Sequence, residues 1–307
     1  MTAALPLPAG VTVFERGWLS ANNILLVGPE QAALVDSGYC SHADQTLQLV
    51  RGQLGARPLD LLANTHLHSD HCGGNAALQS AFPTMQTRIP PGHAQEVARW
   101  DADALSYAPT GQNCPRFRHD GVLLPGTTVH LGAQVWEIHA APGHDPHSVI
   151  LFEPQSRTLM SADALWQAGF GVVFPELEGI DAFADVGRTL DLIEDLQPRL
   201  VIPGHGSPFN EIELALASAR RRLDGFATSP QKHVRYAAKV LLKFKLLEVQ
   251  RFSWETLLTW SKATPYLRLL HATWGADVPF EAWLRKLAEE LEAAGAARLE
   301  GDQVINV

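Results

Sequence analysis

Cysteine is scarce in this chain. The 307 residues include only Cys40, Cys72 and Cys114, an odd number with no C-x-x-C pair. This count does not fit a disulfide framework, and reduced thiols in a cytoplasmic protein are the simplest interpretation. Cysteine chemistry therefore gives no first indication of what the chain does.

Long apolar runs are also absent. No stretch approaches the roughly 18–20 residues that a helix needs to span a bilayer, and the first ten residues lack the basic region and continuous apolar core of a signal peptide. Charged residues make up 19% of the chain and hydrophobic residues 46%, which excludes a disordered, highly charged protein. We therefore expect a globular cytoplasmic protein without a membrane partner, long enough for a large core and a second, smaller domain.

What the chain does contain is a dense cluster of metal-binding residue types. One stretch reads T-H-L-H-S-D-H-C-G-G, so that His66, His68, Asp70 and His71 form an H-x-H-x-D-H run. Neutral imidazoles and carboxylates are the ligands of zinc and similar divalent metals. The run follows an apolar, strand-like segment, residues 59–63. A loop that leaves a strand is where α/β enzymes place their sites.

Three further motifs follow in order, each after a β-like run. They are P-G-H at His144, S-A-D-A-L at Asp163 and P-G-H-G at His205. Together with the H-x-H-x-D-H run, they closely resemble the metallo-β-lactamase superfamily. Four ordered motifs in matching strand–loop contexts are poorly explained by histidines that merely pack or cap.

The resemblance implies a dinuclear metal centre with two divalent ions per chain, zinc being favoured and iron or manganese left open. A hydroxide between the metals is the expected nucleophile, because two cations lower the pKa of water to about neutrality. Asp70 is expected to act catalytically as well, by orienting this nucleophile or accepting its proton. The implied ligands are His66, His68 and His144 for the first metal, Asp70, His71 and His205 for the second, and Asp163 as the bridge.

The same resemblance implies an α+β fold, a four-layer αββα sandwich with the metals at one edge. Asp36, which follows the strand-like residues 32–35, resembles the first motif of the superfamily. We expect it to support the ligand loop without binding metal. His147, three residues after His144, is expected to support the ligands in the same way.

Residues that contact the substrate are harder to place. The loop 166–175 directly follows the expected bridging aspartate, and its glycines and aromatic residues favour either a substrate pocket or rigid support for that ligand. The long connection 85–121 is typical of a lid near a site, and its aromatic residues suit a substrate wall or packing onto the body about equally. The predicted pocket residues are Tyr107, Trp166, Phe170 and Phe174.

The chain changes character after about residue 226. Four segments between residues 231 and 293 have helical periodicity, and the last residues read as a hairpin with a turn at Gly301 and Asp302. We predict a catalytic domain at residues 1–225 and a small, mostly helical domain at residues 226–307. The second domain resembles the winged-helix-like appendage that some superfamily members carry.

Positive charge is concentrated near this boundary. Residues 217–251 contain nine basic and two acidic residues, whereas the whole chain carries a net charge of −9. The basic segment 220–251 makes nucleic acid a candidate partner. A solvated helix face, or one that docks on the acidic body, is the favoured interpretation, because an acidic catalytic domain repels a polyanion.

Three functions therefore stay open. The favoured one is hydrolysis of a small-molecule ester, thioester or lactone, as in the hydroxyacylglutathione hydrolases, although the glutathione-binding basic residues of that group are not identifiable here. The second is a metal-dependent nuclease or phosphodiesterase that acts on RNA through the basic segment. The third is an iron-dependent sulfur dioxygenase, because histidine and carboxylate ligands also suit iron. The sequence determines neither the physiological substrate nor the oligomeric state.

Overall fold

The computed structural model describes residues 6–307. Their contacts divide the chain into two compact units. The first unit contains the residues up to Asp101 together with Cys114–Asp224, and the second contains Ala102–Asn113 together with Gly225–Val307. The short segment Ala102–Asn113, part of the long connection 85–121, groups with the C-terminal part of the chain.

Two β-sheets form the centre of the first unit. In the first sheet, β1, β2 and β3 are antiparallel neighbours, and β3 to β6 run parallel. The second sheet has the order β11-β10-β9-β8-β7 and is antiparallel except for the parallel pair β10 and β11. The strands of the first sheet are β1 (Val11–Phe14), β2 (Asn23–Val27), β3 (Ala32–Val35), β4 (Leu61–Ala63), β5 (Gln86–Ile89) and β6 (Gly121–Val122), and those of the second are β7 (Thr128–Leu131), β8 (Gln134–Ala140), β9 (Val149–Glu153), β10 (Thr158–Ala162) and β11 (Leu200–Pro203).

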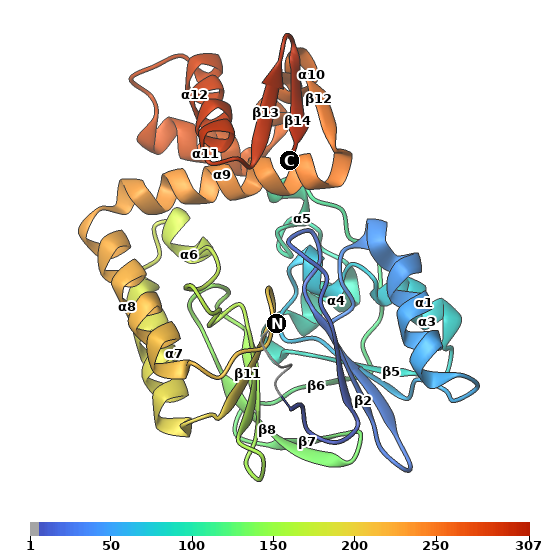
Figure 1. The fold of residues 1–307 in the computed structure, drawn as a ribbon. Coiled ribbons are helices and arrows are strands. Elements are labelled where there is room, and N and C mark those ends of the chain that lie inside the picture. Colours follow the sequence, from blue (N-terminus) through green and yellow to red (C-terminus); the bar gives the residue numbers. More distant parts are fainter. Residues whose placement is uncertain (1–5) are drawn as a thin grey trace. The chain divides into compact units, whose positions relative to one another are not determined.

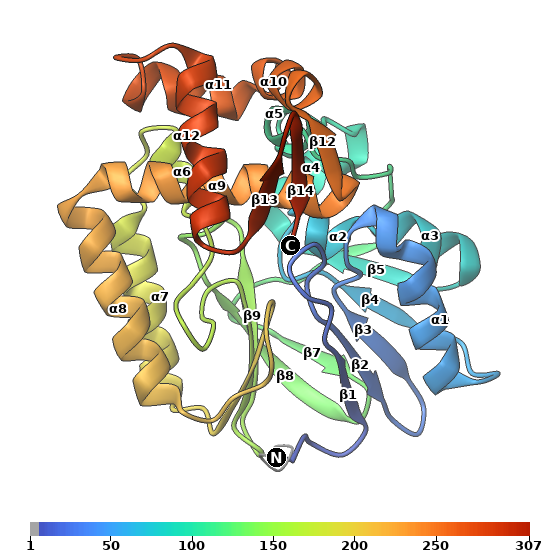
Figure 2. The same ribbon diagram turned by 45° about the horizontal axis from the view of Figure 1, so that its top comes forward.

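Helices cover the outer face of each sheet. In both ribbon views α1 and α3 lie outside the first sheet, and α7 and α8 lie outside the second (Figures 1 and 2). This is the four-layer αββα sandwich that the resemblance implied, and the prediction is confirmed. The helices of this unit are α1 (Ala43–Leu54), α2 (Ser69–Cys72), α3 (Asn75–Ala81), α4 (Ala94–Arg99), α6 (Phe174–Leu177), α7 (Phe183–Leu196) and most of α8 (Ile212–Thr228), with 3-10 turns η1 (Cys40–His42) and η2 (Pro91–His93).

Strand β2 shows how the sequence fills these layers. Because successive side chains of a strand point to opposite faces, Ile24 and Leu26 enter the core between the sheets, where Trp136 also lies. Leu25 points the other way and packs with Val50 of α1. A strand that is buried on both faces reads as a continuous apolar run, and N-I-L-L-V is such a run.

The second unit is mostly helical. Its α5 packs against α11, and α9 packs against α11 and α12. A three-stranded antiparallel sheet has the order β12-β14-β13, and the hairpin of β13 and β14 turns at Gly301, as predicted. The winged-helix resemblance stays a prediction. The elements are α5 (Tyr107–Thr110), α9 (Pro230–Val249), β12 (Arg251–Ser253), α10 (Trp254–Ala263), α11 (Pro265–Trp274), α12 (Phe280–Ala293), β13 (Ala297–Glu300) and β14 (Gln303–Asn306).

No helix within residues 6–307 combines the length and the apolar character that crossing a bilayer requires. The expected absence of a signal peptide concerns residues 1–10, and the first five of these lie outside the described residues.

Candidate metal centre

The strand directions bring the candidate ligands to one edge of the sandwich. Strand β9 is antiparallel to both β8 and β10, and β10 is parallel to β11, so β8, β10 and β11 end at the same edge of their sheet. The loops that leave these ends carry His144, Asp163 and His205. The loop after β4 and the short helix α2 carry the other four candidate ligands. Sites beyond the carboxyl ends of strands are usual in α/β folds.

The first ligand group consists of three imidazoles. The Nδ1 atom of His68 lies 3.1 Å from Nε2 of His66 and 2.8 Å from Nε2 of His144. Nitrogen atoms that bind one tetrahedral zinc ion at 2.0–2.1 Å are about 3.3 Å apart. The three nitrogens therefore converge on one point at a spacing close to that of metal ligands, and they form one compact cluster of ligand atoms.

The second ligand group combines two imidazoles and two carboxylates. The Nε2 atom of His205 lies 3.1 Å from Oδ2 of Asp70. The Nε2 atom of His71 lies 3.4 Å from Oδ1 of Asp163 and 3.8 Å from Oδ2 of Asp70. These four side chains also form one compact cluster of ligand atoms.

Asp163 faces both groups. Its Oδ1 belongs to the second group, and its Oδ2 lies 3.5 Å from Nε2 of His144 in the first group. A carboxylate that presents one oxygen to each group can bridge two cations. Strand β10 has a register irregularity between Met160 and Ala162, and Ala162 has a left-handed φ of 47°. Bulges commonly re-aim side chains beside active sites, and this one immediately precedes Asp163.

One buried atom tests whether these residues fit a metal. Within the described chain, Nε2 of His71 is buried and has no hydrogen-bond partner. A buried polar atom without a partner is costly. A cation held between this nitrogen and the carboxylates of Asp70 and Asp163 would satisfy it, so the second group fits a metal ion.

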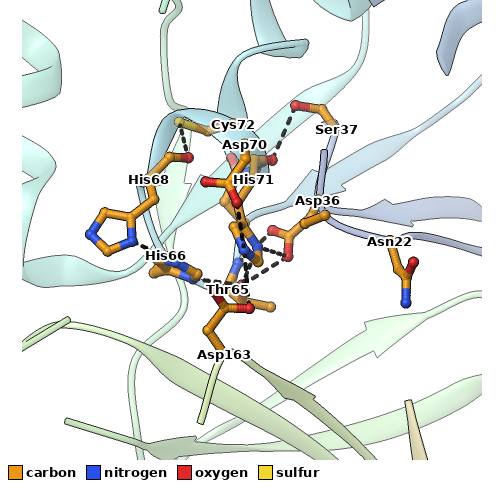
Figure 3. A network of polar contacts seen from close by, with 12 residues as sticks. Asn22, Asp36, Ser37, Thr65, His66, His68, Asp70, His71, Cys72 and Asp163 are labelled. Carbon is orange, nitrogen blue, oxygen red and sulfur yellow. Dashed lines mark hydrogen bonds and ion pairs between the residues drawn. The ribbon is translucent and has the colours of Figure 1, made fainter. Parts of the chain in front are cut away.

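Asp36 fixes the orientation of the ligand loop. Its Oδ1 accepts a hydrogen bond from the backbone N–H of Thr65 at 2.9 Å, and its Oδ2 accepts one from the Thr65 hydroxyl at 2.8 Å. The same Oδ2 lies 2.7 Å from Nδ1 of His71, and a dashed line in Figure 3 marks this contact. With its Nδ1–H donated to Asp36, the His71 ring has Nε2 available as a ligand. Asp36 thus contacts both the ligand loop and a candidate ligand, and its supporting role stays a prediction.

The other imidazoles are oriented in the same manner. The Nδ1 atom of His144 lies 2.5 Å from the carbonyl oxygen of Val172. The Nδ1 atom of His205 lies 3.0 Å from the carbonyl oxygen of Gly17. With Nδ1 directed at these carbonyls, the atom that each ring presents to its ligand group is Nε2. His68 instead directs Nδ1 inward, and its Nε2 lies 3.9 Å from Asp145.

The ionisation of the ligands follows from burial and mutual proximity. Burial lowers the pKa of His66 well below its ordinary value and that of His68 to about 4, and neighbouring imidazoles add to both effects. Burial raises the pKa of Asp163, but the nearby imidazoles outweigh this and hold it well below its ordinary value. For His71, burial lowers the pKa, but the carboxylates, Asp36 first, raise it well above its ordinary value. Metal binding would therefore release a proton from His71.

Two glycines let the backbone approach the ligands closely. A Cβ atom on Gly204 would lie 2.3 Å from Oδ1 of Asp163, and one on Gly171 would lie 2.4 Å from Nδ1 of His144. Neither distance is sterically allowed, so both positions require glycine while the ligands keep these places.

The predicted pocket residues have different surroundings. Trp166 lies beside the second ligand group, where its Nε1 donates to Oδ1 of Asp163 at 3.2 Å. The Phe174 ring lies 5.0 Å from the His68 ring, beside the first group. Phe170 is only 1% exposed, so it has no surface to offer a substrate. Tyr107 is buried in the second unit, as part of α5.

The structure adds contacts for three further residues of the site region, His147, Asp145 and Trp18. His147 contacts the His93 ring at 4.4 Å, and its backbone N–H donates to Asp145. Asp145 thus lies between His147 and the ligand His68, a link that the sequence did not indicate. Trp18 was missed altogether, although its ring stacks on that of His205. Its only sequence signal is a position four residues before the pair Asn22-Asn23.

Comparisons with known proteins agree with this geometry. Residues 16–205 match the metallo-beta-lactamase superfamily. A hydroxyacylglutathione hydrolase from Anaeromyxobacter dehalogenans is 34% identical over 161 residues, which are 52% of this chain and 52% of that protein, so the chain spans about half the length of this relative. The acyl-coenzyme A thioesterase MBLAC2 of Gallus gallus is 27% identical over 225 residues, 66% of this chain and 80% of that protein.

A solved structure shows the same fold. A metallo-beta-lactamase family protein from Thermus thermophilus has a TM-score of 0.58 at 18% identity, covering 98% of this chain and 99% of that one. Fold and site together define an αββα protein with two adjoining groups of metal-ligand side chains. The matched range includes all seven candidate ligands. The chain belongs to the metallo-beta-lactamase superfamily.

Proposed function

We propose that this protein is a metal-dependent hydrolase that cleaves small-molecule thioesters with a pair of divalent ions, most simply zinc. The observation that carries the proposal is the position of Asp163, whose two carboxylate oxygens face two separate groups of ligand atoms. The names of both curated relatives support the reaction class, since one is a hydrolase and the other a thioesterase.

The ligand side chains would hold the ions as two neighbouring centres that share Asp163. Two divalent ions there would supply Lewis acidity and make water ionise near neutral pH. Histidine and carboxylate ligands suit zinc, and they also suit iron and manganese. The identity of the metal is therefore part of the proposal and needs measurement.

Asp70 is the ligand best placed to handle a proton. Its side chain is 14% exposed, so it reaches the open side of the centre, unlike the fully buried His71. Burial raises the pKa of Asp70, but His71 and His205 outweigh this and lower it. The carboxylate is therefore ionised at neutral pH and can accept the proton of the attacking water. The water oxygen then bonds to the acyl carbon, the carbon–sulfur bond breaks, and the proton taken up by Asp70 passes to the departing sulfur, which leaves as the thiol.

The nuclease alternative gains no support from the basic segment. Arg235 and Lys239 pair with Glu290, and Lys245 pairs with Glu248. The ammonium group of Lys243 donates to the carbonyl oxygen of Ala296 and to other acceptors near the end of the chain. These cationic side chains have partners within the protein. This favours a structural role of the segment over a role in binding phosphate.

Elemental analysis of the purified protein together with a small substrate panel tests the proposal. The panel contains a thioester, a lactone, a phosphodiester and a single-stranded RNA, and the His66→Ala variant is the negative control. We expect close to two zinc ions per chain and thioester turnover that the variant lacks. RNA or phosphodiester cleavage as the main activity would replace the proposal by the nuclease alternative. One iron ion per chain without hydrolysis would replace it by oxygen-dependent chemistry.

A further inference from the structure

A large aromatic side chain lies exposed beside the metal centre. Trp18, on the loop between β1 and β2, is 57% exposed. Its ring nevertheless stacks on the His205 ring at a centroid distance of 5.2 Å and an interplanar angle of 12°. An indole with one face on a candidate ligand and much of its surface uncovered presents apolar area at the edge of the site.

The loop that carries Trp18 is fastened to the metal centre by its backbone. Ala21 donates its N–H to the carbonyl oxygen of Asp70 at 2.9 Å, and Asn22 donates its own to Gly204 at 2.7 Å. The Asn22 side chain donates to the carbonyl oxygens of Pro203 and Gly206, and Figure 3 shows it beside the ligand network. The part of the loop that follows Trp18 is therefore tied to the segments that carry Asp70 and His205.

Other aromatic rings continue this surface. The Trp166 ring meets Trp18 edge-on at 5.2 Å and lies 5.5 Å from the His205 ring. Its Nε1–H already donates a hydrogen bond to Asp163, so the remaining surface of the ring is apolar. Phe174 lies at the first ligand group, 5.0 Å from the His68 ring. Aromatic side chains thus lie beside both ligand groups.

We propose that Trp18 is a specificity-determining residue that binds the apolar acyl chain of the substrate, so that the enzyme favours thioesters of longer acyl groups over acetyl thioesters. This inference rests on the proposed function and adds the substrate class. The reacting carbonyl must lie at the ligand groups. An acyl chain that extends from this carbonyl past His205 contacts the Trp18 ring. Each methylene removed from water by such a contact improves binding about fourfold.

The experiment compares acyl-chain length at a constant thiol. Acetyl, butanoyl and octanoyl thioesters of N-acetylcysteamine are hydrolysed by wild type, Trp18→Ala and Trp18→Phe. Trp274→Ala is the matched control, because Trp274 is similarly exposed, at 44%, but belongs to the second unit. We expect Trp18→Ala to lower kcat/KM for the octanoyl ester about 10- to 30-fold and for the acetyl ester less than about 2-fold. Trp18→Phe should retain most of the preference, and the control should match wild type.

A binding measurement separates this inference from the proposed function. Calorimetry with the non-hydrolysable S-octyl and S-ethyl thioethers of N-acetylcysteamine is carried out on the purified protein, and metal content is measured in parallel. Tighter binding of the octyl compound that Trp18→Ala abolishes, with metal content unchanged, supports the role of Trp18 even if no thioester is turned over. An equal loss for every chain length, or a loss of metal in Trp18→Ala, means that Trp18 only supports His205 and overturns the inference.

Discussion

The carboxylate of Asp36 lies 2.7 Å from the imidazole of His71, Oδ2 to Nδ1. Asp36 also accepts two hydrogen bonds from Thr65, the residue just before the first candidate ligand. Its φ of 57° is left-handed, a conformation that costs a residue with a side chain roughly 1–3 kcal/mol. The surrounding hydrogen bonds hold it there. One aspartate outside both ligand groups thus sets the ring orientation of a ligand and the course of the ligand loop.

Replacing Asp36 should therefore weaken metal binding without removing a ligand. We expect Asp36→Asn to lower the affinity of the second ligand group about 10- to 100-fold, the usual effect of losing such a partner. Competition with a chromophoric chelator measures this affinity. Asp120→Asn is the matched control, since Asp120 also accepts a backbone hydrogen bond, from Thr87, but is not part of the network around the ligands. Equal affinities for wild type and Asp36→Asn would contradict the supporting role.

Removal of the shared carboxylate should have a larger effect. Because Asp163 faces both ligand groups, Asp163→Ala should lose bound metal and lower kcat/KM at least about 100-fold. Elemental analysis and steady-state kinetics on the same preparation check both parts. Full activity with unchanged metal content would rule out a centre built around this residue.

The close approach of Gly204 gives a steric test. An added methyl group would lie 2.3 Å from Oδ1 of Asp163 and 3.0 Å from the His71 ring, so Gly204→Ala must displace a ligand. We expect reduced metal content and a loss of activity of at least about tenfold, because ligand geometry tolerates little displacement. Gly52→Ala is the control: this helical position in α1 has open space, and alanine there should be neutral or stabilise by up to about 1 kcal/mol. If both variants behave like wild type, the backbone at residue 204 has more room than the structure shows.

The second unit should respond to acid through His233. This α9 residue is buried, and burial lowers its pKa from 6.5 to about 4. Between these two values the unfolded chain binds a proton that the folded chain does not, so stability falls as the pH falls from about 6.5 to about 4 and His233 contributes no further loss below that. The full effect is about 3 kcal/mol. Urea unfolding of wild type and His233→Gln at several pH values measures it. The variant should show a smaller slope in this range, and parallel slopes would exclude His233 as the cause.

Much of the fold could be predicted because its signals are local. The strand-like residues 32–35 form β3, the strand-like residues 59–63 contain β4, and the predicted turn at Gly301 and Asp302 joins β13 and β14, since apolar runs and turn residues mark them directly. Nothing in the long connection 85–121 indicated that its residues 102–113 group with the C-terminal unit. Their partner there is α11, more than 150 positions later, and no local pattern encodes such a contact.

The same distinction between local sequence signals and tertiary contacts applies to the candidate site. The sequence by itself determined which residues are candidate ligands, because metal binding needs particular side-chain types at short, ordered spacings. Only the tertiary structure decided that Asp163 faces both ligand groups, that Asp36 orients His71, and that Trp18 stacks on His205. Each of these relationships joins residues that are at least 19 positions apart. They arise where strand ends from two sheets meet, and that meeting is a property of the packed sandwich.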